Sequence, residues 1–489
     1  MARAISALVL YLSITAPAYA IAPEIWYNGI PATPPSQQPH PIATGVPGEL
    51  GFSLGELYAP QLEAWKLELT TRTGTKTIHA DNLGERLYGI HVIQAGSSWD
   101  VMLDTGPGTA GERIKSVSRI AITGESCPEK TIEVWVSWEG VTELKAEIMS
   151  WAANAGISAK VVEVPSIKSK LITVLRGGGK LPDLVMVQSD YLPDLVDAGA
   201  LQPLDGLWIP EADAKGRKVF ELHGSLMAAP FYCDSQVVFY STRLIVSAPE
   251  ADWTLDDMEK MASASGAHVG AAWNAYSAYW LLPFVIGFGK PEIIAPDGRM
   301  NVTHPAYEQA LTYLKNAGSS GFLSPMERDA MMAYFTSGKV AFILSGSYSI
   351  PEFRRLGLPF EVAPFPLVSK GGKRVAPLLD YKGWAVTRGT KNPVLARRLV
   401  QYLSGAGVQA AFCTPLGKLP ASKSAWDLMP MDGKYAKVLR TSYADGIAVP
   451  PDRAYGTFKN ASWKLIRLYL GGSISARETL EALATIMGE

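Results

Sequence analysis

Three short apolar runs separated by two amphipathic segments constrain the fold of this chain more than any other feature. Residues 131–136 and 160–164 are rich in β-branched side chains, and residues 184–187 are apolar throughout. Between these runs, residues 142–155 and 167–175 repeat apolar side chains at helical spacing, and a glycine closely follows each segment. Strands that alternate with helices at such short intervals predict a parallel sheet with right-handed crossovers.

Acidic residues follow the first and the third of these predicted strands. Glu139 comes shortly after the first strand, and Asp190 comes shortly after the third. The carboxyl ends of parallel strands meet at one edge of the sheet, where open α/β folds bind their ligands. We therefore expect a ligand site at this edge.

The length and the charge of the chain restrict its class. A chain of 489 residues exceeds what one hydrophobic core supports, so we expect several domains. The 45 basic and 46 acidic residues leave a net charge of −1, and they form no dense run of Lys or Arg. Such a chain has no overall field that would attract nucleic acid, and nucleic-acid binding is therefore not expected.

The first twenty residues have the pattern of a secretory signal peptide. Arg3 provides a positive start, residues 4–14 are apolar, and the small residues Ala18 and Ala20 provide a cleavage site after Ala20. No cysteine follows this site directly, so we expect no lipid anchor, and no later apolar run is long enough to span a membrane. The pattern predicts an exported protein that is periplasmic or otherwise extracytoplasmic.

Two further segments separate this signal from the predicted α/β unit. Residues 21–47 contain closely spaced prolines and predict an extended lead-in. Residues 48–126 alternate apolar and polar side chains in short runs that Gly, Asp and Asn separate, which predicts a small all-β, sandwich-like domain. This domain weakly resembles jelly-roll carbohydrate-binding modules, and a spacer domain fits the pattern equally well.

The chain shows none of the spacings that common catalytic or metal sites require. Its three cysteines, Cys127, Cys233 and Cys413, are far apart, so at most one intramolecular disulfide is possible and no zinc site is expected. The Arg-Gly-Gly-Gly-Lys run at 176–180 lacks the spacing of a phosphate loop, and the six histidines are scattered. We therefore expect no enzyme, no metal and no cofactor.

Two longer motifs in the second half of the chain point to a known family. The first spans residues 335–348 and reads Phe-x-x-Gly-Lys-x-Ala, followed by an apolar run and Gly-x-Tyr. The second is a predicted strand at 382–386 followed by a helix at 392–403 that opens with Asn-Pro. With these motifs the chain resembles the bacterial extracellular solute-binding proteins of the maltodextrin-binding class, over about residues 131–489.

The resemblance implies an α/β fold of two lobes, the periplasmic-binding-protein fold, joined by crossing hinge strands. Lobe 1 would comprise residues 130–232 and 364–428, and lobe 2 would comprise residues 233–363 and 429–489. The small all-β domain would precede these lobes as an addition to the usual architecture of the class.

The resemblance also implies where a solute would bind. Four residues match positions of ligand-contact motifs of the class and are acidic or aromatic here too: Glu139, Asp190, Asp234 and Tyr348. The chain departs from the class at two further candidates, because Tyr191 replaces an Arg and Tyr276 falls roughly where an acidic residue would be, which argues against the same ligand register. Aromatic residues at strand ends or helix starts provide either alternative stacking surfaces or packing: Trp138, Tyr381, Trp384, Tyr455 and Phe458.

These features predict an exported receptor of an ABC importer. Acids beside aromatic rings, together with the resemblance, favour an oligosaccharide as the small solute held between the lobes. The lobes would close by bending near residues 231–235 and 363–366, and the receptor, a monomer, would present its solute to a membrane permease. Two alternatives stay open: a secreted carbohydrate-active enzyme with an N-terminal carbohydrate-binding module, and a surface or scaffold protein that uses the same fold without transport.

Overall fold

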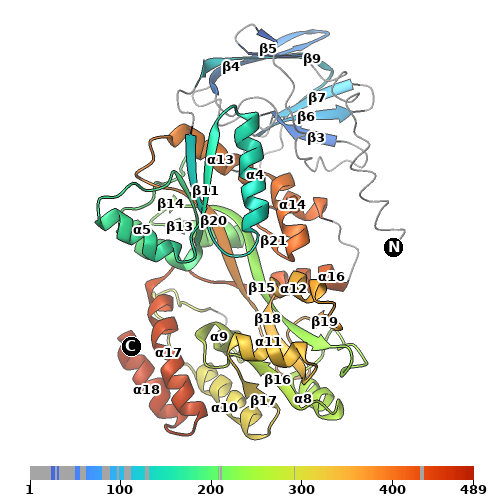
Figure 1. Ribbon diagram of the computed structural model, residues 1–489, viewed down its shortest axis with the longest axis vertical. Helices are drawn as coiled ribbons and strands as arrows, with labels where there is room; N and C mark the ends of the chain where they lie inside the picture. The colour runs from blue at the N-terminus through green and yellow to red at the C-terminus, as the bar shows by residue number, and fades with distance from the viewer. Residues whose placement is uncertain are drawn as a thin grey trace.

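A computed structural model describes most of the chain. It describes residues 131–489 apart from 208, 210–211, 291 and 430–433, and before them residues 24–27, 30–31, 50–54, 62–79, 89–95, 98–103 and 112–126. The predicted signal peptide and Cys127 lie outside the described residues. Figure 1 shows an elongated molecule in which a β-rich unit, a first α/β lobe and a second α/β lobe follow one another along the long axis.

Two small sheets form the N-terminal unit, as the alternating pattern predicted. One has the strand order β2-β1-β9-β4-β5 and the other the order β3-β6-β7-β8. Leu67 and Leu69 of β4, and Ile120 and Ile122 of β9, are buried at alternate positions, as expected for a sheet with one covered face. The strands are β1 (Glu24–Tyr27), β2 (Ile30–Pro31), β3 (Leu50–Ser53), β4 (Leu62–Thr71), β5 (Gly74–His79), β6 (Ile90–Ala95), β7 (Ser98–Leu103), β8 (Glu112–Ile114) and β9 (Val117–Ser126).

Strands β1 and β2 lie inside the proline-containing segment that predicted an extended lead-in. Strand β1 pairs in parallel with β9, from Glu24 opposite Arg119 to Tyr27 opposite Ile122. That part of the segment therefore belongs to the five-stranded sheet. The pairing joins residues far apart in the chain, which local composition does not reveal.

Lobe 1 contains the strands and helices predicted from the three apolar runs. Strands β10 and β12 run parallel, and β10 also pairs in parallel with β11. Leu144, Ile148 and Trp151 lie on one face of α4 and are buried against this sheet. The elements are β10 (Thr131–Val136), α4 (Val141–Asn154), β11 (Ser158–Glu163), α5 (Ile167–Arg176), β12 (Leu184–Gln188), η3 (Ser189–Tyr191), α6 (Leu192–Asp197), α7 (Ala214–Phe220), β13 (Glu221–Leu222), β14 (Ser225–Leu226), α13 (Pro393–Leu403), α14 (Ala406–Leu416), β21 (Leu419–Pro420) and α15 (Lys423–Leu428).

Lobe 2 repeats this architecture with its own strands and helices. Strand β16 pairs in parallel with both β17 and β18, and helix α17 packs against α9, α10 and α18. The elements are α8 (Leu255–Ala264), β16 (Val269–Trp273), α9 (Ala278–Gly287), α10 (Pro305–Ser319), β17 (Leu323–Pro325), α11 (Arg328–Thr336), β18 (Val340–Gly346), α12 (Ser349–Arg355), β19 (Phe360–Ala363), α16 (Lys434–Asp445), α17 (Arg453–Leu470) and α18 (Ala476–Met487).

The long strand β15 (Ala229–Ser241) joins the two lobes. All of its residues are buried, because its first half pairs with β20 (Leu378–Val386) of lobe 1 and its second half pairs with β18 and β19 of lobe 2. The pairing changes between Ser235 and Gln236, three residues beyond the lobe boundary expected from the sequence. The predicted crossing strands are confirmed.

A second connection runs from β22 (Ile447–Ala448), which pairs with the start of β20, into helix α17. The hydroxyl of Ser189 donates to the carbonyl of Val449 over 2.9 Å and so ties this connection to the end of β12. Among the described residues, no helix combines the length and the apolarity that a membrane span requires.

Candidate functional site

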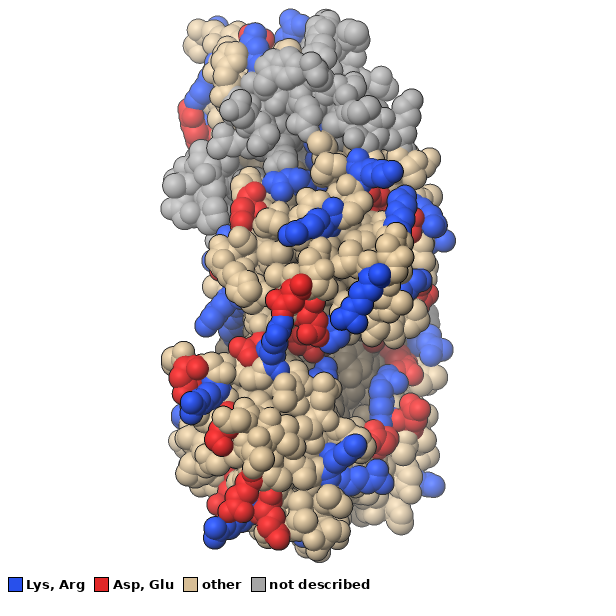
Figure 2. Space-filling view, turned by 90° about the vertical axis from the view of Figure 1, so that its left-hand side faces the viewer, with Lys and Arg blue, Asp and Glu red and all other residues tan. Residues whose placement is uncertain are grey.

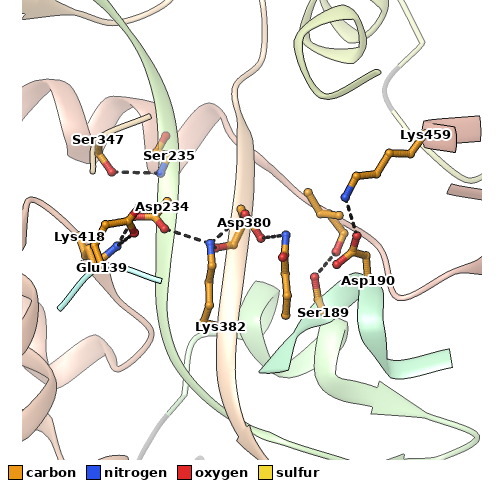
Figure 3. A network of polar contacts seen from close by, with 12 residues as sticks. Glu139, Ser189, Asp190, Asp234, Ser235, Ser347, Asp380, Lys382, Lys418 and Lys459 are labelled. Carbon is orange, nitrogen blue, oxygen red and sulfur yellow. Dashed lines mark hydrogen bonds and ion pairs between the residues drawn. The ribbon is translucent and has the colours of Figure 1, made fainter. Parts of the chain in front are cut away.

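The carboxyl edge of the lobe 1 sheet, where the sequence predicts a ligand site, lies where the two lobes meet. Figure 2 shows a recess at this waist, with acidic and basic side chains at its rim. Charged and hydroxyl side chains from lobe 1, from the crossing strands and from helix α17 form what we call the polar row (Figure 3). The polar row comprises Glu139, Ser189, Asp190, Asp234, Asp380, Lys382, Lys418 and Lys459.

Asp190 follows β12 and has one carboxylate oxygen that no group among the described residues uses as an acceptor. Its side chain is 6% exposed, and Oδ2 lies 3.1 Å from the ammonium of Lys459 on helix α17. Oδ1 is buried and has no hydrogen-bond partner among the described residues. Since a buried carboxylate oxygen without a donor is costly, this atom indicates a place for a ligand hydroxyl or a water molecule.

The aromatic residue Tyr191 directly follows this carboxylate in the chain and lies near its charge. The rings of Tyr191 and Trp138 lie 6.1 Å apart, and Trp138 has a left-handed backbone with φ of 66°. Such a conformation is uncommon for a bulky residue and is concentrated at functional sites. Burial, with the charges of Asp190 and Asp380, raises the pKa of Tyr191 to about 12, so its hydroxyl remains a hydrogen-bond donor at neutral pH.

Asp234, at the crossing point of β15, is already paired on both oxygens. Its Oδ1 lies 3.0 Å from Lys418 and its Oδ2 lies 3.0 Å from Lys382, and all three side chains are buried. Burial opposes the charged carboxylate, but the two ammonium groups outweigh this effect and lower the pKa of Asp234. Lys418 also reaches Glu139, which is half exposed, over 3.2 Å.

Asp380 is a carboxylate of the polar row that the sequence did not single out. It lies directly opposite Asp234 in the antiparallel pair of β20 and β15. Its Oδ2 is 2.8 Å from Lys382, and its Oδ1 accepts a hydrogen bond of 2.7 Å from the side-chain amide of Gln188. Burial raises the pKa of Asp380 in spite of Lys382, and the nearby charges of Asp190 and Asp234 act in the same direction.

Lobe 2 places two of the predicted tyrosines at the ends of its strands. Tyr348 follows β18 at the start of α12, and burial raises its pKa. Tyr276 lies between β16 and α9, with the guanidinium of Arg467 at 5.7 Å from its ring centre. Asn274, which the sequence did not single out, donates to Glu327 over 2.7 Å, while its Oδ1 is buried without a partner among the described residues.

Four of the predicted aromatic candidates are buried in the core. Tyr381 is fully buried and its hydroxyl donates to Asp213 over 2.9 Å. Trp384, Tyr455 and Phe458 are also buried. A buried ring has no open face for a sugar, so we leave these four out of the proposed ligand surface and assign them a packing role.

The lysines of the polar row are the main functional candidates that the sequence analysis missed. Lys382 lies inside a run of apolar residues, and a charged side chain in a buried strand requires a buried partner. The sequence therefore indicated that Lys382 has a buried partner, but it did not identify which residue that partner is. Cys233 and Cys413 are free and buried, and burial raises the pKa of both thiols. In the described part of the chain no group of His, Cys, Asp or Glu side chains is placed to hold a metal ion.

Residues 148–437 match the bacterial extracellular solute-binding protein family. The chain belongs to this family. The resemblance inferred from the two sequence motifs is therefore confirmed, and the family match covers parts of both lobes.

Curated relatives of this solute-binding protein are distant. It is 23% identical over 286 residues to the maltodextrin-binding protein MdxE of Bacillus subtilis, an alignment that covers 55% of this chain and 68% of that protein. A probable ABC transporter-binding protein of Deinococcus radiodurans is 26% identical over 346 residues, which cover 63% of this chain and 80% of the relative.

Solved structures show the same two-lobed fold. The maltotriose-binding protein of Thermus thermophilus, bound with maltotriose, superimposes with a TM-score of 0.64 at 23% identity, over 73% of this chain and 98% of that one. The maltose-maltodextrin binding protein of Alicyclobacillus acidocaldarius gives a TM-score of 0.66 at 19% identity, over 74% of this chain and all of the other. The fold predicted for the two lobes is confirmed.

Proposed function

We propose that this solute-binding protein is the extracytoplasmic receptor of an ABC importer and that its solute is an oligosaccharide. The solute is held between the lobes, which close around it by bending at the Ser235–Gln236 crossing and at the connections beside it, and the closed receptor delivers the solute to a permease. Relatives whose names refer to maltodextrin and to ABC transport support this proposal. They are named as binding proteins, which supports a receptor without catalytic activity.

One observation carries the choice of ligand: the unpaired buried oxygen of Asp190 lies next to aromatic residues. A sugar hydroxyl donates a hydrogen bond to such an oxygen, and the C–H face of a pyranose packs on rings such as those of Trp138 and Tyr191. An uncharged solute suits the site, because Asp190 and Asp234 already have lysine partners. A cationic solute would have to displace one of these lysines.

The same arrangement decides which acid a mutation should test. Both oxygens of Asp234 are bound by lysines, so its removal would disturb the crossing strands before it removed a ligand contact. Asp190 is the better choice, because one of its oxygens has no donor in the described part of the chain. Asp194, four residues further on in α6, is a matched control whose ion pair with Lys168 is well exposed.

A thermal-shift screen of the mature protein with malto-oligosaccharides and other sugars tests the proposal. Ligand at 100 times its dissociation constant stabilises a protein by about 2.7 kcal/mol, which gives a clear shift. We expect a shift with one class of sugar that is reduced in Asp190→Asn and retained in Asp194→Asn, without turnover of the sugar. No shift with any sugar would exclude the oligosaccharide assignment, and product formation would favour a secreted carbohydrate-active enzyme.

A further inference from the structure

We propose that Lys382 is a positioning residue for solute capture: it holds the carboxylate of Asp380 charged beside Asp190, as a second acidic acceptor for the solute. This inference rests on the proposed function, since it concerns the same interlobe site. The two carboxylates lie together in the polar row, on β20 and after β12 (Figure 3).

Two like charges face each other across the hinge strands. Asp234 of β15 and Asp380 of β20 stand directly opposite each other, an arrangement that is unfavourable for two carboxylates unless a cation lies between them. The ammonium of Lys382 lies 3.0 Å from Asp234 Oδ2 and 2.8 Å from Asp380 Oδ2. Lys382 therefore bridges the two strands next to the crossing point.

Lys382 has no N–H donor left for a solute. An ammonium group has three N–H donors. Two of them serve the carboxylates of Asp234 and Asp380, and the third reaches the backbone carbonyl of Asp380 at 3.3 Å. The Lys382 side chain is also only 3% exposed. Lys382 can therefore affect the solute only through the residues that it contacts.

The charges of Asp234 and Asp380 depend on Lys382 to different degrees. Asp234 has a second ammonium, that of Lys418, at 3.0 Å. Asp380 has no other lysine or arginine partner among the described residues, and its second oxygen is bound by the neutral amide of Gln188. Burial already raises the pKa of Asp380, whereas the pKa of Asp234 is lowered. Loss of Lys382 would therefore protonate Asp380 first.

Asp380 lies within reach of the proposed ligand surface. Its side chain is 16% exposed, whereas that of Asp234 is almost completely buried. The ionisable groups that face it are the carboxylates of Asp190 and Asp234, the ammonium of Lys382, and the hydroxyls of three tyrosines on η3, α9 and α17. These tyrosines are Tyr191, Tyr279 and Tyr455. Each of its oxygens already accepts one hydrogen bond and keeps a second lone pair, so a charged Asp380 offers this surface a stronger acceptor than a protonated Asp380 does.

The experiment compares wild type, Lys382→Met and the double variant Lys382→Met/Asp380→Asn. The double variant lacks the charges of both Lys382 and Asp380, so it tests the role of a charged Asp380 even if the single variant folds poorly. The dissociation constant of the sugar found in the thermal-shift screen is measured by calorimetry from pH 5.5 to 8.5. Melting temperatures without sugar are recorded over the same range.

We expect wild type to bind with little dependence on pH. Lys382→Met should bind about tenfold more weakly at neutral pH, the loss expected for one charged hydrogen bond, and should recover as pH rises and Asp380 ionises. The double variant should bind weakly at every pH. Wild-type affinity in Lys382→Met, or a weakening that is the same at every pH, would overturn the positioning role.

The melting temperatures separate this inference from the proposed function. If the pKa of Asp380 is raised further in the folded Lys382→Met variant, its stability relative to wild type falls as pH rises. A wild-type protein that binds none of the sugars overturns the proposed function, and the positioning role with it. If the melting temperature of Lys382→Met equals that of wild type at every pH, the inference that Lys382 keeps Asp380 charged is overturned.

Discussion

Replacement of Lys418 by methionine is the most direct test of how the crossing point is held together. The ammonium of Lys418 is fully buried, 3.0 Å from Asp234 Oδ1 and 3.2 Å from Glu139 Oε2. It also lies 4.5 Å from the ring centre of Tyr232. Methionine has a similar length and no charge, so the substitution removes the ion pair with little change in volume.

The magnitude follows from burial and distance. At the 3.0 Å that separates Lys418 from Asp234, two unit charges attract each other by about 5–6 kcal/mol if the effective dielectric constant is about 20. The net loss of stability in the variant is smaller than this attraction, because the variant no longer buries an ammonium group and Asp234 keeps Lys382 as a partner. Loss of one partner of a buried pair typically costs about 3–5 kcal/mol, which is the destabilisation we expect. The half-exposed Glu139 adds at most about 1 kcal/mol.

Urea unfolding at pH 7, followed by tryptophan fluorescence, measures this loss. The pKa of Lys418 is raised, because its pairing with Asp234 outweighs burial, so its contribution is fully present at pH 7 and is lost only above its unfolded pKa. The pKa of Asp234 is lowered, so its contribution is present above its unfolded pKa and is lost as pH falls. The difference between wild type and variant should therefore narrow below about pH 4, the usual pKa of Asp.

Two controls make the result specific to the buried pair. Lys168→Met removes an ion pair with Asp194 that is well exposed, and it should cost less than about 1 kcal/mol. The double variant Lys418→Met/Asp234→Asn should recover part of the loss, because the only carboxylate it leaves without Lys418 is the half-exposed Glu139. A loss below about 1 kcal/mol in Lys418→Met would refute the reasoning that this buried pair secures the crossing strands.

Three further changes test the packing around the site, each by urea or thermal unfolding. Gly383→Ala places a Cβ 2.7 Å from a backbone oxygen of the paired strand and should lower the free energy of unfolding by about 1–3 kcal/mol. Gly456→Ala meets open space in helix α17 and should raise the free energy of unfolding by about 0.5–1 kcal/mol. A Gly383→Ala variant that is more stable than Gly456→Ala would contradict the packing. Tyr381→Phe removes the donor to the buried Asp213 and should cost about 1–3 kcal/mol while sugar affinity is unchanged, and a weakened affinity would return Tyr381 to the ligand surface. Thr254→Ala removes the capping box of α8 and should cost about 1 kcal/mol, and an unchanged stability would argue against the cap.

The order of strands and helices in lobe 1 could be predicted because local periodicity encodes burial. The apolar run at 184–187 predicted a strand covered on both faces, and β12 is buried over those residues. The acidic residue that follows it was expected at a ligand edge, and the structure places Asp190 before Tyr191, whose ring lies 6.1 Å from that of Trp138. Its role as a ligand group stays a prediction.

The partners of the buried charges could not be predicted, because they lie far apart in the chain. Lys382 and Lys418 are 148 and 184 residues away from Asp234, and no local pattern connects them. The choice between a stacking and a packing role for Tyr381 and Trp384 could not be made from the sequence for a related reason. An aromatic side chain at a strand end reads the same in the sequence whether neighbouring elements cover it or leave it open.

The position of β20 has a consequence for the order in which this chain can acquire its structure during synthesis. In the sheet of lobe 1, β20 lies between β12 and β15, although it follows all of lobe 2's sheet strands in the sequence. Until β20 has been synthesised, β12 and β15 have no strand between them to receive their hydrogen bonds. Lobe 1 is therefore not an independent early product, because residues 378–386 must be present before it can close its core.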